Sequence, residues 1–419
     1  MFKFNNGGLF SDLFNTRTQP PKTFKYHELL EILRMQGVSS IFKDESKLDM
    51  SYIPRDLPNR EKQLKKLKNH FSGTLSQGIS RHVLLYGDIG TGKTVTAKRF
   101  CQMISADAKK AGKEIKWARV NCMDHLSPNT ILSAVFEELN IRIPERGFSD
   151  EEMLDNLRRY LKSRSAHLIL ILDDVDAHFK KYGCRFIYSL TRFNEGFKLK
   201  GYEGLSLILI SHDNLLERFN PATISSFGHT KIEFSRYTCE ELIEIVKQRV
   251  NLAFYSGKVN DESIKLIADI ASVWGDARFA IELLWKAGKI AEENEDPEVT
   301  PEHVRAAKAD TYSVITESKL KYLGKHERLV LLAIARKLRR TGKAYLRTGE
   351  AFDVYKVVCE EHGENPRKER QFLDYLKRLH GYDFIDLKIS GAGERGRSHL
   401  ISVPDVPTQV IERKLSEIL

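Results

Sequence analysis

The stretch "HVLLYGDIGTGKT", residues 82–94, decides the fold of this 419-residue chain. Residues 82–86 form a short apolar run typical of a buried strand. Residues 87–94 match the spacing G-x-x-x-x-G-K-[ST] at every position, and the glycines let backbone N–H groups turn inward around phosphate oxygens. Residues 95–104 have a helical pattern, and the positive end of that helix favours a phosphate. The stretch therefore predicts the strand, loop and helix that open an α/β nucleotide-binding domain.

The loop also assigns roles to its polar side chains. We expect the ammonium of Lys93 to contact the terminal phosphates of ATP or ADP, and the hydroxyl of Thr94 to bind Mg²⁺. A chance match in a glycine-rich loop is the alternative, and the flanking strand and helix disfavour it. The predicted nucleotide-binding residues of the loop are Gly87, Asp88, Ile89, Gly90, Thr91, Gly92, Lys93, Thr94 and Val95.

A second apolar run, "LILILDDVD" (168–176), ends in two acids. We expect Asp173 to complete the magnesium site with Thr94, and Asp174 to orient the attacking water. Asp174 is one methylene shorter than the Glu usual at that position. Either acid could instead cap the next helix, which suits Asp well. The pair therefore predicts a metal partner at Asp173 and a catalytic carboxylate at Asp174.

The pattern of apolar residues changes along the chain. Strand-like runs alternate with helical stretches over residues 41–236, which predicts a parallel sheet covered on both faces. Residues 237–315 show only helical spacing and predict a helical lid, with Thr238 and Thr300 as helix starts. Residues 316–419 read as three helices and a hairpin, a winged helix-turn-helix, and residues 1–40 as a flexible tail with one short helix near 26–35. The fold class is α/β with a lid and a terminal winged helix.

Composition sets the general class of protein. The net charge is +10, and residues 325–400 hold 17 Lys and Arg against 11 Asp and Glu, which indicates a polyanionic partner for that region. No apolar stretch reaches the ~20 residues that a membrane-spanning helix needs, and no secretion signal is recognisable. Five scattered cysteines are typical of reduced core residues. We therefore expect a cytoplasmic protein associated with the nucleoid rather than a membrane.

Together, the phosphate loop, "LILILDDVD", the lid segment "GDARFAIELL" and the terminal winged helix resemble an archaeal replication initiator. That family is related to the origin recognition complex and the helicase-loading cell-division-cycle ATPases, within the AAA+ class. The resemblance covers residues 41 to about 403 and rests on the combination of motifs. It implies ATP or ADP with Mg²⁺ as cofactors and duplex DNA of a replication origin as a partner. A second initiator paralogue on neighbouring DNA and the replicative helicase are further implied partners.

The resemblance places the base and γ-phosphate contacts. Residues 41–67 resemble the family's upstream segment, which cradles the adenine, and Arg278 matches the second sensor, a lid arginine near the γ-phosphate. An exposed lid arginine without a function is the alternative for Arg278. The adenine-side residues implied by the "Y-x-P-x-x-L-x-x-R" pattern are Tyr52, Ile53, Pro54 and Arg60.

Two positions depart from the family pattern. The first sensor, usually Asn, falls in "ILISHDN" (208–214), where His212 or Asn214 could fill it and His212 aligns best. The arginine finger that would act on a neighbouring subunit is replaced by Ala222, and the nearest arginine, Arg218, lies on a predicted surface. Since a missing finger can lower turnover by ~10³–10⁵, we expect tight ATP binding and slow hydrolysis.

The winged-helix region supplies the predicted DNA contacts. We expect residues 365–380 to form an amphipathic helix whose basic end enters the major groove. A wing between the two strands would lie along the minor groove. A solvated basic face without a ligand is the alternative. The predicted DNA-binding residues are Arg367, Lys368, Arg370, Gln371 and Lys377 on the helix, and Arg395 and Arg397 on the wing.

A further DNA contact from the ATPase domain is implied at residues 127–130, although a helix cap at Ser127 explains that segment equally well. The sequence thus predicts an ATP-binding initiator that recognises origin DNA and uses slow hydrolysis as a conformational switch. A transcription regulator acting at promoters is the main alternative, since no residue separates the two. A protein-remodelling ATPase would need the finger that Ala222 replaces, and a small-molecule kinase would have no use for a basic winged helix.

Overall fold

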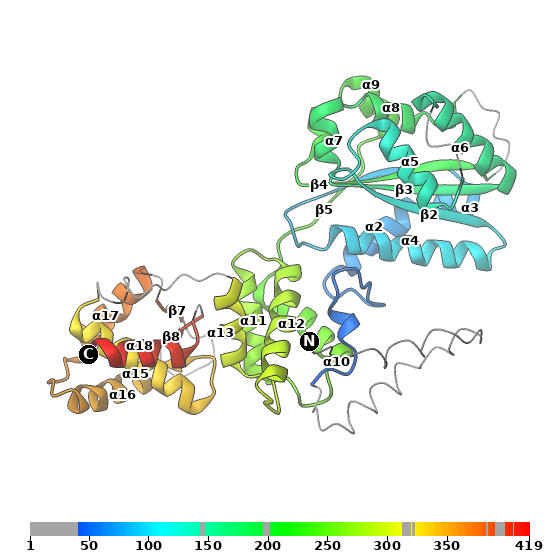
Figure 1. Ribbon diagram of the computed structural model, residues 1–419. Coiled ribbons are helices and arrows are strands. Elements are labelled where there is room, and N and C mark those ends of the chain that lie inside the picture. Colours follow the sequence, from blue (N-terminus) through cyan, green and yellow to red (C-terminus); the bar gives the residue numbers. More distant parts are fainter. Residues whose placement is uncertain are drawn as a thin grey trace, which may run out of the picture. The chain divides into compact units, whose positions relative to one another are not determined.

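An α/β domain, a helical lid domain and a winged-helix domain follow one another along the chain (Figure 1). Within the described ranges, no helix has the length and apolar character to cross a membrane. The predicted tail at 1–40 lies outside the described residues, and so does its short helix. The computed structural model describes residues 41–142, 147–195, 202–311, 320, 323–382, 384–389, 399–404 and 406–419.

The α/β domain is built on a parallel five-stranded sheet in the order β2-β3-β4-β1-β5. The bounds of each strand agree within a few residues with those of an apolar run in the sequence. Because the strands are parallel, the carboxyl ends of β1, β4 and β3 meet at one edge of the sheet, where ligands bind in open α/β folds. The strands are β1 (His82–Tyr86), β2 (Glu114–Asn121), β3 (Ala166–Asp173), β4 (Gly204–Ser211) and β5 (Lys231–Glu233).

Alternating side chains on β3 explain how both faces of the sheet are covered. Leu168, Leu170 and Leu172 enter one core, while Ile169 and Ile171 enter the other. Helices α5 to α9 cover the leucine face, and α2 and α4 cover the isoleucine face (Figure 1). The helices of this domain are α2 (Glu61–His70), α3 (Ser72–Gln77), α4 (Lys93–Lys110), α5 (Pro128–Glu138), α6 (Asp150–Arg164), α7 (Val175–Tyr182), α8 (Arg185–Thr191) and α9 (Pro221–Phe227), with the 3-10 helices η1 (Glu45–Leu48) and η2 (Leu215–Arg218).

The lid domain consists of four helices around one apolar core. The Thr238 hydroxyl accepts a hydrogen bond from the backbone N–H of Glu241 and starts the first of them, as the sequence predicted. Residues 41–48 pack into this core, where the rings of Phe42 and Phe254 lie 4.7 Å apart. The upstream segment therefore contacts the lid as well as the sheet domain. The lid helices are α10 (Cys239–Ala253), α11 (Asp261–Ser272), α12 (Ala277–Glu293) and α13 (Pro301–Thr311).

The winged-helix domain packs its helices around the central part of α15, in which residues 329–335 are fully buried. Its antiparallel sheet has the order β6-β8-β7. Helix α18 and strand β6 complete the domain, and neither was predicted from the sequence. The elements are α15 (Lys325–Thr341), β6 (Leu346–Arg347), α16 (Thr348–Glu361), α17 (Glu369–Gly381), β7 (Asp386–Ile389), β8 (His399–Ser402) and α18 (Thr408–Ile418).

Candidate functional site

The loop at the carboxyl end of β1 has the backbone that the glycine pattern requires. Gly90 and Gly92 have φ values of 73° and 87°, in the left-handed region, and Gly92 immediately precedes α4. A Cβ atom on Gly92 would lie 2.6 Å from the Tyr237 hydroxyl, so the position has no room for a side chain. The loop therefore wraps the N-terminal end of α4, the geometry that binds phosphate.

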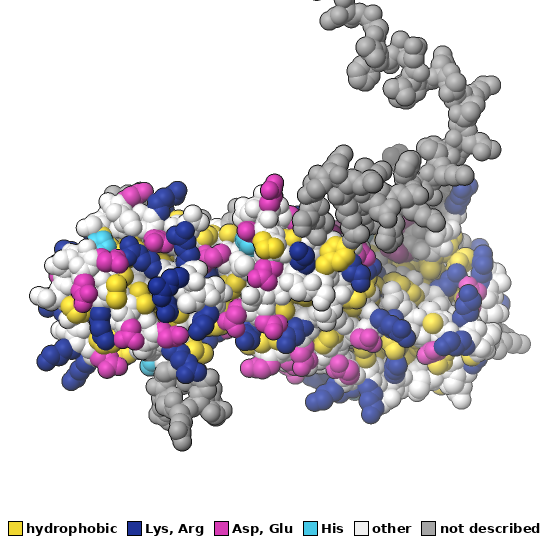
Figure 2. Space-filling view, turned by 90° about the horizontal axis from the view of Figure 1, so that it is seen from below, with side chains coloured by type: hydrophobic (Ala, Val, Ile, Leu, Met, Phe, Trp, Pro, Cys, Tyr) yellow, Lys and Arg dark blue, Asp and Glu magenta, His cyan; other side chains and the backbone are white. Residues whose placement is uncertain are grey.

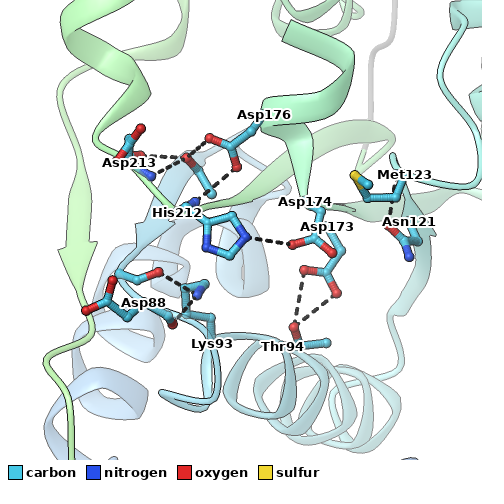
Figure 3. A network of polar contacts seen from close by, with 12 residues as sticks. Asp88, Lys93, Thr94, Asn121, Met123, Asp173, Asp174, Asp176, His212 and Asp213 are labelled. Atoms are coloured by element: carbon cyan, nitrogen blue, oxygen red, sulfur yellow. Dashed lines mark hydrogen bonds and ion pairs between the residues drawn. The ribbon is translucent and has the colours of Figure 1, made fainter. Parts of the chain in front are cut away.

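Lys93 lies inside this loop (Figure 3). Its ammonium donates hydrogen bonds to the carbonyl oxygens of Gly87 and Asp88, and each donor–acceptor distance is 2.7 Å. The side chain is 7% exposed, and burial lowers its pKa, while Asp173 and Asp174 oppose that shift. The ammonium is thus held within reach of any phosphate that the loop binds.

Asp173 and Thr94 come together as the sequence predicted. The Thr94 hydroxyl donates to the Asp173 carboxylate, at 3.0 Å from Oδ2 and 3.2 Å from Oδ1. A hydroxyl and a carboxylate are the hard oxygen ligands that Mg²⁺ prefers, and Mg²⁺ usually keeps several waters besides them. The pair therefore fits a magnesium ion, which Thr94 and Asp173 would hold together.

Asp174 faces His212 across the site (Figure 3), with 3.8 Å between Asp174 Oδ1 and His212 Nε2. It precedes α7 with a left-handed backbone (φ 50°), and its side chain makes no capping hydrogen bond. Burial and the neighbouring Asp173 raise its pKa. Asp174 therefore precedes the helix without donating or accepting a capping hydrogen bond. Its carboxylate lines the cavity beside the phosphate loop.

His212, rather than Asn214, lines this cavity. Its backbone N–H donates to the Asp176 carboxylate over 3.0 Å, and the same carboxylate accepts from the Ser211 hydroxyl over 2.8 Å. The Asn214 amide instead bonds to Glu217. Asp176 was not predicted as a site residue, yet it fixes the turn that presents His212.

The lid contacts the phosphate loop through the start of α12. The backbone N–H of Ala277 donates to the carbonyl oxygen of Gly90 over 3.2 Å, while Asp276 caps the helix. Arg278 follows, is exposed and lines the cavity, and its guanidinium has no bonding partner among the described residues. The start of the lid helix therefore presents a free cation to the nucleotide cavity.

The cavity between these elements measures about 470 Å³. Tyr52 and Ile53 line it, as the upstream pattern implied, and residues 89–95 of the loop line it as well. Three cations in its wall were not predicted. They are Lys98 on α4, Arg119 on β2 and Arg249 on α10.

Arg60 lies behind the loop rather than in the cavity. It is 2% exposed, and its guanidinium donates to the carbonyl oxygens of Thr91, Asn59 and Ser235. All these donors bond to backbone, so the structure gives Arg60 a supporting role that differs from the implied contact with adenine. Pro54 is likewise buried outside the cavity.

The predicted DNA-binding side chains between residues 367 and 377 are exposed. Arg370, Gln371 and Lys377 project from α17 and have no side-chain partner among the described residues. Figure 2 shows Lys and Arg side chains on the winged-helix domain, interspersed with acids. Arg395 and Arg397 lie outside the described residues.

The predicted helix over 365–380 is too long at its start, because α17 begins at Glu369. Arg367 and Lys368 therefore precede it. The backbone N–H of Arg367 donates to the Tyr355 hydroxyl over 3.2 Å, and its Nε donates to His326 Nε2 over 3.0 Å. These tertiary contacts hold the segment out of the helix.

Comparison with known proteins follows the same division of the chain. Residues 79–219 match the model of an AAA domain, residues 243–309 the Cdc6 AAA+ ATPase-type lid domain, and residues 318–413 the CDC6 C-terminal winged helix domain. The chain is 32% identical over 376 residues to ORC1-type DNA replication protein 2 of Sulfurisphaera tokodaii, a match covering 87% of this chain and 90% of that protein. The chain belongs to the ORC1/Cdc6 family of AAA+ replication proteins.

Solved ORC1/Cdc6 structures have the same fold. Cdc6p from Pyrobaculum aerophilum is 29% identical, with a TM-score of 0.76 and coverage of 90% of this chain and 98% of that one. The Aeropyrum pernix ORC1 protein in complex with DNA is also 29% identical, with a TM-score of 0.60 and coverage of 90% and 97%. One protein with the fold of this ORC1/Cdc6 protein was thus solved in complex with DNA.

The structure also shows where Ala222 lies, the position at which the family resemblance implies an arginine finger. Ala222 is exposed on α9, and Arg218 packs over the ring of Phe179 at 5.1 Å. Ser127, near the implied ATPase-domain DNA contact, caps α5 in a reciprocal bond pair with Thr130. That cap gives the segment a structural role, and its contact with DNA stays a prediction.

Proposed function

We propose that this protein is an ATP-binding replication initiator that binds origin duplex DNA through its winged helix and its AAA+ domain. One observation carries the proposal: a phosphate loop and the lid cation Arg278 line one cavity, in a chain whose winged helix exposes Arg370 and Lys377. Nucleotide binding and DNA binding would therefore belong to one molecule. Mg²⁺ would be held at Thr94 and near Asp173, where it would offset the charge of the phosphates.

Nucleotide state would act as a switch between the sheet domain and the lid. The lid touches the phosphate loop at Gly90, and Arg278 stands beside it with no other partner in the part of the chain that the structure describes. A γ-phosphate would attract the Arg278 guanidinium, and hydrolysis would remove that attraction. We infer slow hydrolysis, because Asp174 is short, His212 occupies the first-sensor position and Ala222 supplies no finger. A second initiator on neighbouring DNA and the replicative helicase are the partners that this role would need.

Footprinting on candidate origins, with ATP, with ADP and with the variant Lys93→Ala, tests the proposal. We expect a preferred site that changes in extent between the two nucleotides and no longer responds to nucleotide in Lys93→Ala. Lys109→Ala is the matched control, since Lys109 is exposed on the same helix α4 outside the cavity. The absence of any preferred site would overturn the proposal.

The side chains of α17 test the DNA-binding part separately. Arg370 lies at the start of the helix, so Arg370→Ala should reduce the preference for the site by about tenfold, as expected when one base contact is lost. Lys377 lies two turns further along, so Lys377→Ala should weaken binding evenly across sequences. Genome-wide occupancy at many promoters, instead of at replication start sites, would favour a transcription regulator.

A further inference from the structure

Arg119 forms an ion pair with the predicted magnesium partner. Its Nη2 and Nε atoms donate to one carboxylate oxygen, Oδ2 of Asp173, over 2.7 Å and 2.8 Å. Asp173 is 2% exposed and the Arg119 side chain 29%, so the carboxylate end of this contact is shielded from solvent. Charge-assisted bonds of this kind are stronger than neutral ones, and poor screening adds to their strength.

The sheet explains why the two side chains meet. In the parallel pair β2–β3, Asn121 lies opposite Asp173 and Arg119 lies opposite Ile171. Arg119 therefore starts one pleat below the end of the sheet and extends its guanidinium toward the edge. It lines the nucleotide cavity together with Thr94 and Asp173. A fixed cation thus stands at the edge of the sheet where a magnesium ion would be held.

We infer that Arg119 acts as a built-in cation at the magnesium position, so that this protein binds nucleotide with little dependence on Mg²⁺. The inference rests on the proposed nucleotide binding and adds a property of that site. When Mg²⁺ is absent, Arg119 compensates the charge of Asp173, which would otherwise repel the phosphates. When Mg²⁺ binds, it shares the carboxylate with Arg119 and gains less than it would from a free carboxylate.

The test is a titration of the full-length protein with a fluorescent ADP analogue, in excess Mg²⁺ and in EDTA. For the wild type, we expect the dissociation constants under the two conditions to differ by about tenfold or less. In Arg119→Gln the ratio of the EDTA value to the Mg²⁺ value should rise by at least ~10-fold, because Asp173 loses its compensating charge. The Mg²⁺ concentration for half-maximal binding in EDTA-free buffer should fall in the same variant.

Two further variants separate this role from a general loss of structure. Arg119→Lys keeps the charge without the two-donor geometry, so its ratio should return toward that of the wild type. Arg249→Gln removes another cation of the same cavity, which lies over the ring of Tyr52 and which no described hydrogen bond, ion pair or electrostatic interaction joins to Asp173. It should weaken binding equally with and without Mg²⁺. Thermal melting of each variant shows whether a change in affinity accompanies unfolding.

The outcomes are distinguishable from failure of the proposed function. If the wild type binds no ADP under either condition, the proposed nucleotide site is wrong. If it binds ADP in Mg²⁺ and its affinity falls more than tenfold in EDTA, the inference about Arg119 is wrong while the nucleotide site stands. An Arg119→Gln protein that weakens equally in both conditions would also overturn the inference, since that is the response of a structural residue.

Discussion

The guanidinium Nε of Arg60 donates to the carbonyl oxygen of Thr91 over 2.9 Å, inside the protein. Further donors of the same guanidinium bond to the carbonyls of Asn59 and Ser235, and its carbon lies 3.7 Å from the centre of the Tyr237 ring. One side chain therefore joins the upstream segment, the phosphate loop and the connector that leads to the lid. Burial lowers the pKa of Arg60, and Tyr237 and Glu241 oppose that shift.

Replacing Arg60 by Met should destabilise the protein by about 2–4 kcal/mol, because the buried guanidinium would no longer donate to three carbonyl oxygens, of which that of Thr91 is buried. Urea denaturation of the two proteins measures the change in the free energy of unfolding. Arg55→Met serves as the control, since Arg55 is exposed in the same segment. Equal stability of Arg60→Met and the wild type would show that the buried hydrogen bonds contribute nothing net.

Arg278→Ala should weaken ATP binding by about tenfold while ADP binding changes by less than about threefold, since only ATP offers a γ-phosphate to the lid arginine. Isothermal titration with the two nucleotides gives both constants on one protein sample. A uniform loss of both affinities would assign Arg278 to general charge attraction instead of γ-phosphate sensing.

Asp174→Asn tests the catalytic carboxylate. We expect the wild type to turn over ATP more slowly than ~1 s⁻¹, and Asp174→Asn to lower that rate by a further ~100-fold or more. ATP affinity should stay within about threefold, because Asp174 makes no hydrogen bond to the phosphate loop. Phosphate release and nucleotide binding are measured together. An unchanged rate in the variant would remove Asp174 from the mechanism.

The contact between Arg367 and His326 should depend on pH. His326 Nε2 accepts from Arg367, and Nδ1 bonds to the Tyr355 hydroxyl over 2.8 Å, so the neutral ring fits this environment. Burial and the nearby Arg367 lower the pKa of His326 below its usual 6.5, with Lys325 adding to the shift and Glu364 opposing it. The stability that His326 contributes is therefore present above about pH 6.5 and lost as pH falls through the lowered pKa.

Urea denaturation of the wild type and His326→Gln between pH 8 and pH 4.5 measures this effect. We expect the stability difference between them to shrink as the pH falls. His362→Gln, which changes another histidine of the same domain, is the control. A difference that stays constant over the whole range from pH 8 to pH 4.5 would contradict the assignment.

Much of the fold was predictable because local pattern and tertiary structure agree. The run at 168–172 is apolar at every position, and the structure buries both of its faces. The glycine spacing at 87–92 required a left-handed backbone, which is observed. Short or amphipathic elements were harder: β6 has two residues, and α18 becomes recognisable only through its packing on α15.

Two site residues could not be assigned correctly from the sequence, each for its own reason. Arg119 lies in β2, a strand that the sequence indicates only through its apolar residues. The pairing of β2 with β3 is what shows that Arg119 reaches Asp173. The one signal was a charged residue two positions before the strand end, next to the acidic strand. Arg60 was misplaced for the opposite reason, because a sequence pattern cannot show that all of an arginine's hydrogen bonds point to backbone.

Gly90 occupies a variable position of the phosphate-loop pattern, yet here it accepts little variation. A Cβ atom on Gly90 would collide with the carboxylate of Asp276, which belongs to the lid. Its φ of 73° adds strain for any larger residue. The identity of one loop residue is therefore constrained both by its own backbone and by a domain that begins about 150 positions later. Grafting the lid of another relative onto this chain would succeed only if residues 90 and 276 were matched.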